Sequence, residues 1–227
     1  SVSEAVSLLF FIIYTSMTAD KRKYGFRRAF TLRPHLLKGI LSISGWTMVQ
    51  SFISVSIWFI FFLAIEHLGE RPLAVTNIVR NISALLIMVI SAFATTAGAL
   101  ISNQIGAGEQ RCLFKTCGMT LKLTYAILIP LLIILCLFPE SVLRAFTDSP
   151  SLIAASVNSV YVMASSTLIM APSFILFNAV SGTGNTRAGF IMEMISLAVY
   201  TAVIYYGIIR LKPDVALCWF SEHVYGV

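Results

Sequence analysis

The sequence predicts an all-α polytopic membrane protein. Hydrophobic residues make up 58% of its 227 residues and charged residues only 11%, whereas a soluble domain is about one quarter charged. The mean hydropathy of the chain is +0.87. A helix needs roughly 20 mostly apolar residues to cross the hydrocarbon core of a bilayer, and several charge-free stretches of about that length occur. We therefore expect about six membrane-spanning helices.

Charge-free stretches bounded by charged or turn residues mark the predicted spanning helices. The first runs from Gly45 to Ile65 and reads GWTMVQSFISVSIWFIFFLAI. The last starts near Ala188, contains Glu193 and ends before Arg210. The others lie between the following pairs of charged residues: Arg80 and Glu109, Lys122 and Glu140, and Asp148 and Arg187.

Both ends of the sequence have the composition of partial helices. Residues 1–18 have no initiating Met, no basic start and no small-residue cleavage site, all of which a signal peptide needs. These residues are therefore predicted to be the end of a spanning helix. Residues 212–227 begin another apolar segment that is too short to cross a bilayer. We expect the chain to be a fragment of a longer membrane protein.

The distribution of Lys and Arg predicts the orientation, because these residues are retained in short cytoplasmic loops. They concentrate in the segment 19–38, in residues 111–122 and at Arg187, which are alternate loops of the predicted bundle. The basic segment 19–38 is then cytoplasmic, and anionic lipid is its expected partner, at roughly 1 kcal/mol per basic side chain. The alternative is a segment that only sets topology. The net charge of +6 therefore does not indicate a nucleic-acid partner.

The sequence contains no catalytic, metal-binding or cofactor-binding pattern. Its four cysteines form no CxxC pair and its three histidines no HExxH motif. The glycine-rich SGTGNTR at 181–187 does not match GxGxxG, and a dinucleotide site also needs a preceding strand. Its glycines instead suit a turn between two helices, with Asn185 or Thr186 capping the second. We expect neither an enzyme nor a metal or cofactor site.

Four connecting segments resemble those of one transporter family. SNQIGAGEQR at 102–111 and FNAVSGTGNTR at 177–187 each follow a spanning stretch, and they are similar to cytoplasmic loops of the multidrug and toxic compound extrusion (MATE) transporters. EHLGERPLAVTNIVRNIS at 66–83 and FPESVLRAFTDSP at 138–150 resemble extracellular loops of that family. The order and spacing of the four segments, from about Leu36 to Leu211, carry the resemblance.

The resemblance implies a place for the chain within a larger fold. In the MATE family, twelve helices form two six-helix lobes around a central cavity that opens alternately to each side. Residues 1–18 resemble the end of helix six, and 19–38 the cytoplasmic linker between the lobes. Residues 39–211 resemble helices seven to eleven of the C-terminal lobe, and 212–227 the start of a truncated helix twelve. The missing N-terminal lobe is then the expected partner of this chain.

The resemblance also implies a function. MATE transporters export organic cations, drugs or similar amphiphiles by antiport against protons or sodium ions. The expected location is the cell membrane, and in a bacterium the inner membrane. The alternative is a lipid-linked saccharide flippase, which shares the same distant architecture. A flippase would need a strongly basic cavity, and the predicted helices have no central Arg or Lys.

Ion coupling needs a group inside the membrane whose charge or ligation changes. Glu193 is the best candidate. A charged side chain at mid-bilayer costs about 2.5 to 3.5 kcal/mol, so Glu193 should face the bundle or stay protonated. The alternative is a boundary residue that reaches water or pairs with Arg187. Many MATE members carry carboxylates in helices seven and ten. At these helices this chain offers the following polar candidates for ion coupling or substrate binding: Gln50, Ser54, Asn158 and Asn178.

Large side chains on the same two helices are candidates for the cavity wall. Aromatic rings and methionines suit a cavity that binds flat cations, although such residues also face lipid or pack between helices. The cavity candidates are Trp46, Phe52, Trp58, Met163 and Met170.

Pro130 and Pro172 each remove a backbone donor within a predicted helix. Each is either a hinge or the site of a static kink.

Overall fold

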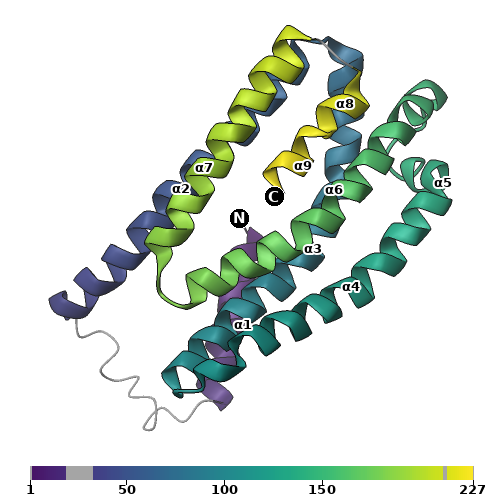
Figure 1. Cartoon of the computed structure of the whole chain (residues 1–227). Coiled ribbons are helices and arrows are strands. Elements are labelled where there is room, and N and C mark those ends of the chain that lie inside the picture. Colours follow the sequence, from purple (N-terminus) through teal and green to yellow (C-terminus); the bar gives the residue numbers. More distant parts are fainter. Residues whose placement is uncertain (1, 19–32, 212–213, 227) are drawn as a thin grey trace. The chain divides into compact units, whose positions relative to one another are not determined.

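The computed structural model describes residues 2–18, 33–211 and 214–226. All the elements in these residues are helices, and the expected all-α fold is confirmed (Figure 1). Five of the helices in the described residues are long and apolar enough to cross a membrane, and each overlaps one of the five predicted stretches. The described elements are α1 (Val2–Thr18), α2 (Pro34–Glu66), α3 (Glu70–Gly106), η2 (Gln110–Cys112), α4 (Leu113–Leu137), α5 (Pro139–Leu143), α6 (Pro150–Gly182), α7 (Thr186–Val203), the π-helix η3 (Ile204–Arg210), α8 (Val215–Trp219) and α9 (Ser221–Tyr225).

The chain divides into two compact units, Ser1–Ser42 and Ile43–Val227. In the first unit, α1 forms the helix that was predicted at the start of the chain. Most of the basic segment predicted at 19–38 lies outside the described residues. The helix that follows it begins at Pro34, a position where proline is favoured because the first helical N–H has no partner within the helix.

Two of the three apolar clusters found in the described residues are large. The larger one lies between α3, α4 and α6 and also contains Trp219 of α8 and Leu143 of α5. The smaller one joins Phe61 and Ile65 of α2 to Tyr200 of α7 and to η3. In Figure 1, α7 runs along α2, and α8 and α9 lie between this pair and α6. Many large apolar side chains point outward, including Phe52, which is 75% exposed, as expected for a protein whose outer surface contacts lipid.

Helix α3 begins earlier than the sequence predicts. The charge-free stretch indicated a start after Arg80, whereas the helix starts at Glu70. The added turns are amphipathic: Val75 and Val79 are buried in the larger cluster, while Arg71 and Arg80 remain exposed. The guanidinium of Arg80 lies 5.0 Å from the ring centroid of Phe62 on α2, within the range of a cation–π contact. The positions of the charged residues alone therefore predict the wrong start for this helix.

Helices α3 and α6 approach each other closely at two glycines. A Cβ atom added to Gly182 would lie 3.0 Å from Gly98 Cα, and one added to Gly98 would lie 2.9 Å from the carbonyl oxygen of Asn178. Ala94, Ala97 and Ala179 are buried nearby on the same two helices. Small residues let helix backbones come into contact inside a membrane, where van der Waals contact is the main attraction between helices.

Two hydrogen bonds from tyrosine hydroxyls connect α4 and α6. Pro172 removes the donor that the carbonyl of Leu168, four residues earlier, would otherwise receive, and the hydroxyl of Tyr125 on α4 donates to that oxygen at 2.8 Å. In the other direction, the hydroxyl of Tyr161 on α6 donates at 3.4 Å to the carbonyl of Cys136 in the last turn of α4. Each bond satisfies a backbone acceptor that its own helix leaves free.

The two glycine loops reverse the chain as expected from the sequence. Gly108 and Gly184 have φ of 79° and 82°, a left-handed conformation that glycine adopts without steric cost. Asn185 caps α7, since its side-chain oxygen accepts a hydrogen bond from the N–H of Ala188 at 3.2 Å. The predicted cap at this position is confirmed, and it fixes where α7 begins.

Replacing the cap by Asn185→Ala is expected to destabilise the protein by about 1 kcal/mol, because the first turn of α7 loses an acceptor for one of its free N–H groups. Thermal unfolding in detergent measures the effect. Asn103→Ala, at an exposed position within α3, is the matched control. Equal melting temperatures for the two variants would contradict a stabilising cap.

Candidate functional site

A pocket of about 480 Å³ lies between α2, α6, α7 and α9, a volume within the range of small-molecule sites. Its wall is mostly apolar and contains two phenylalanines, Phe174 and Phe177, together with Met192. Glu193 is the acidic residue of the wall. The remaining lining residues are Gln50, Ser51, Ser54, Val55, Ser173, Leu176, Asn178, Val180, Ser196 and Tyr225.

Glu193 is held by hydroxyl groups from two other helices. Its Oε1 atom accepts a hydrogen bond from Ser54 Oγ of α2 at 2.8 Å and one from the hydroxyl of Tyr225 on α9, also at 2.8 Å. Glu193 is half-buried and lies seven residues after the start of α7 at Thr186, about 10 Å along the helix axis. Within the described part of the chain, no Lys or Arg lines the pocket beside it.

Ser54 has two possible acceptors for its single proton. Its Oγ lies 2.8 Å from Glu193 Oε1 and 3.0 Å from the carbonyl oxygen of Gln50, one turn earlier in α2. A serine hydroxyl carries one donor, so it donates to one oxygen at a time. The second acceptor lets Ser54 keep a hydrogen bond when Glu193 no longer receives one.

The structure brings four of the predicted polar residues to this pocket. Gln50 and Ser54 reach it from α2, Asn178 from α6 and Glu193 from α7. The amide of Asn178 donates to the carbonyl of Phe174 at 2.9 Å, so its position is fixed by its own helix. The fifth polar candidate, Asn158, is exposed near the start of α6 and does not line the pocket.

The five predicted wall residues do not line the pocket. Trp46 contacts Phe190, with ring centroids 5.1 Å apart. Phe52 points outward, and Trp58 packs against Phe62 with ring centroids 5.3 Å apart. The two methionines, Met163 and Met170, are buried in α6. The rings that do line the pocket, Phe174 and Phe177, lie further along α6.

The terminal segment supplies residues that the sequence did not indicate. Tyr225 closes the pocket from α9, and Ser173 of α6 donates to the carbonyl of Gly226. Glu222 is buried, and its Oε1 accepts a hydrogen bond from the hydroxyl of Tyr200. The only sequence signal was the presence of a carboxyl group and a tyrosine in an apolar segment, and that segment is too short to be recognised as a spanning helix.

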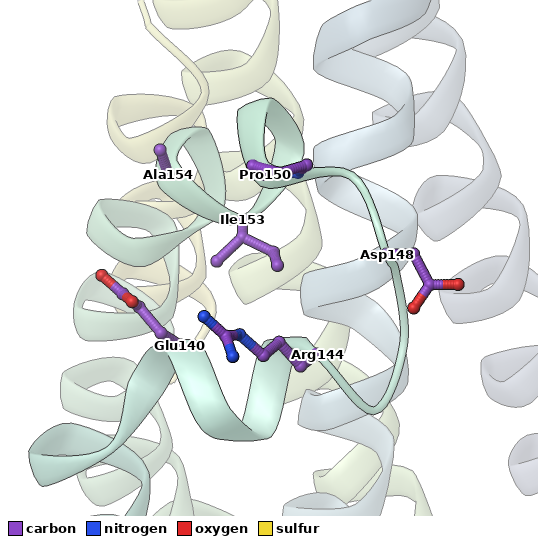
Figure 2. A pocket seen from close by; sticks show the side chains of 6 residues that line it. All are labelled: Glu140, Arg144, Asp148, Pro150, Ile153 and Ala154. Atoms are coloured by element: carbon purple, nitrogen blue, oxygen red, sulfur yellow. The ribbon is translucent and has the colours of Figure 1, made fainter.

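A second hollow lies at the other end of α6, at the connection from α5 (Figure 2). It is lined by the charged side chains of Glu140, Arg144 and Asp148 around Ile153. All three charged residues are exposed. Water reaches these groups, and no site is assigned to this hollow.

The helical bundle has five helices long and apolar enough to cross a membrane, which is typical of a multi-pass membrane protein, and it contains a mostly apolar pocket with one carboxyl group in its wall. The model of the MatE family matches residues 47–206, and the chain belongs to this family of membrane transporters. The predicted family is thus confirmed. None of the curated proteins matches the chain.

Three solved structures share the fold. They are a MOP superfamily transporter from Pyrococcus furiosus, described by the reverse polarity of its binding pocket, an outward-facing multidrug resistance MATE family transporter, and MATE in complex with MaD3S. Each is 13% identical to this chain, with TM-scores of 0.75, 0.75 and 0.76. The matches cover 83% of this chain but only 42%, 42% and 43% of those transporters. The chain thus spans less than half of their length.

Proposed function

We propose that the chain is the C-terminal lobe of a secondary active transporter that exports organic cations by antiport against protons or sodium ions. The observation that carries the proposal is Glu193, a carboxyl group in the wall of a mostly apolar pocket with two phenylalanines. A carboxylate attracts a cation, and aromatic faces add to that attraction. Such a pocket favours an amphiphilic cation over a neutral or anionic ligand.

Glu193 is also suited to coupling, because it lies inside a spanning helix and interacts with two other helices. An ionised carboxyl group accepts both hydroxyl hydrogens, whereas a protonated one becomes a donor itself. A change of its charge therefore alters its bonds to Ser54 of α2 and Tyr225 of α9. This is the kind of differential contact through which an ion can bias two access states.

The lipid-linked saccharide flippase is the weaker candidate. Its substrates carry phosphate groups, which Arg and Lys bind. The lining of the pocket in the described residues contains neither. We therefore propose that the substrate is a cationic amphiphile. We also expect the transporter to act in the cell membrane, together with an N-terminal lobe and with anionic lipid at residues 19–38.

Efflux of ethidium from bacteria that lack their own drug pumps tests the function. The complete reading frame is expressed, and the proton and sodium gradients are collapsed separately. We expect efflux that stops when one of the two gradients is removed, because antiport draws its free energy from that gradient. Efflux that persists without both gradients, or no efflux of ethidium and related cations by a protein shown to be in the membrane, would argue against the proposal.

A further inference from the structure

A second carboxyl group, Glu222 of α9, lies deeper in the protein than Glu193. Only 4% of Glu222 is exposed. Its Oε1 accepts a hydrogen bond from the hydroxyl of Tyr200 on α7, and no Lys or Arg of the described residues acts on it. An ionised carboxylate without a cationic partner is strongly unfavourable in such surroundings, and the group normally takes up a proton instead.

Glu222 is connected to the pocket through two tyrosines. The rings of Tyr200 and Tyr225 are in contact, with centroids 5.4 Å apart and an interplanar angle of 50°. The hydroxyl of Tyr225 donates to Glu193 Oε1 at 2.8 Å, and Tyr225 interacts electrostatically with both carboxyl groups. The order in space is Glu193, Tyr225, Tyr200 and Glu222, and all four groups belong to α7 and α9.

The remaining titratable groups near these four side chains do not neutralise the two carboxyl groups. His223 follows Glu222 on α9, but its Nε2 lies 2.9 Å from Ser165 Oγ of α6, and its buried Nδ1 has no partner among the described residues. On α8, Cys218 belongs to the same apolar cluster as Tyr200. From α2, only the hydroxyl of Ser54 reaches Glu193. The two carboxyl groups are thus surrounded by hydroxyl donors rather than by positive charges.

We propose that Glu193 and Glu222 form a pair of proton-binding groups joined by Tyr225 and Tyr200. Each carboxylate binds one proton on an oxygen atom, so its charge changes from −1 to 0 and no other bond is broken. The inference rests on the proposed function and adds to it a proton as coupling ion and a second binding site. The described residues hold no cluster of three or more His, Cys, Asp or Glu side chains that could bind a metal ion, whereas a proton needs a single carboxyl oxygen.

The two sites differ in what they contact. Glu193 lines the pocket, so a cation bound there competes with a proton for the same carboxylate oxygens. Glu222 does not line the pocket and is separated from it by the two tyrosine rings. Binding of a cation at Glu193 therefore expels one proton directly. The charge that remains changes the field at Tyr225, through which Glu222 responds.

Infrared difference spectroscopy between low and high pH tests the pair on the purified protein from the complete reading frame. Protonated carboxyl groups give carbonyl bands that carboxylates lack. We expect Glu222→Gln to remove one band and Glu193→Gln to remove another. Tyr200→Phe should keep the Glu222 band but shift it, because the carboxyl group loses its hydrogen-bond partner. Glu193→Gln should also shift the midpoint pH of the Glu222 band.

Glu140→Gln, at an exposed position on α5, is the matched control and should leave the carbonyl bands of Glu193 and Glu222 in place. A spectrum of Glu222→Gln identical to that of the parent protein would overturn the proposal. If Glu222→Gln does not fold, Tyr200→Phe is the deciding variant. A Tyr200→Phe spectrum without a shifted carbonyl band would also overturn the proposal, because a protonated Glu222 that loses its hydrogen-bond partner must change its band position. The measurement needs no transported substrate, so its failure is distinct from a failure of ethidium efflux.

Discussion

Glu193→Gln is expected to weaken the coupling between ion binding and ethidium binding by about 5- to 150-fold, or about 1 to 3 kcal/mol, and thereby to reduce gradient-driven efflux of ethidium. Glutamine has nearly the same shape as glutamate, and its amide oxygen can still accept hydrogen bonds from Ser54 and Tyr225. It cannot change its charge, so a proton or sodium gradient no longer biases the site. It also attracts a cation less strongly.

The control for this prediction is Glu140→Gln, which removes a charge of the same kind from the exposed hollow at α5. Both variants should accumulate in the membrane to the same level as the parent protein. Binding of ethidium, measured by fluorescence polarisation on purified protein, separates weaker binding from lost coupling. Efflux by Glu193→Gln at the rate and pH dependence of the parent protein would show that Glu193 is a boundary residue without a coupling role.

Gly182→Ala is expected to destabilise the bundle by about 1 to 3 kcal/mol, the usual cost of overpacking. The added methyl group would meet backbone atoms of Gly98, including Cα at 3.0 Å. A backbone in the middle of a helix cannot move aside as the end of a flexible side chain can. The higher helix propensity of alanine, about 1 kcal/mol relative to glycine, offsets only part of this cost.

Gly118→Ala on α4 separates these two contributions. A Cβ atom at this position meets nothing within 4 Å, so the variant gains helix propensity without a clash and should be as stable as the parent protein or more so. Thermal unfolding in detergent, followed by the fluorescence of a thiol-reactive dye, gives both values. A melting temperature of Gly182→Ala at or above that of Gly118→Ala would mean that α3 and α6 are not in contact at this crossing.

The sequence predicted the helices better than the site. The long apolar stretches and the cap at Asn185 each depend on local chemistry, and both are found where the sequence predicts them. The early start of α3 was missed because its first turns mix exposed arginines with buried valines. Such a segment has no charge-free run to detect.

The site was only partly predictable, because a pocket depends on which helix faces meet. Gln50, Ser54 and Glu193 share a wall although they come from distant parts of the chain, and their polarity in apolar stretches was a usable signal. Asn158 gave the same signal but is exposed. Glu222 gave only a weak signal, a carboxyl group in a short apolar segment, since its burial depends on the contact of α9 with α7 rather than on its neighbours in the sequence.

The two tyrosine bonds between α4 and α6 bear on how this protein can change shape. Bending α6 at Pro172 would have to break the bond from Tyr125 to Leu168, and sliding α4 along α6 would also break the bond from Tyr161 to Cys136. We therefore expect the larger apolar cluster to move as one block. The pocket lies where α6 meets α2 and α7, and we expect its width to change by shear between the helices rather than by bending at Pro172.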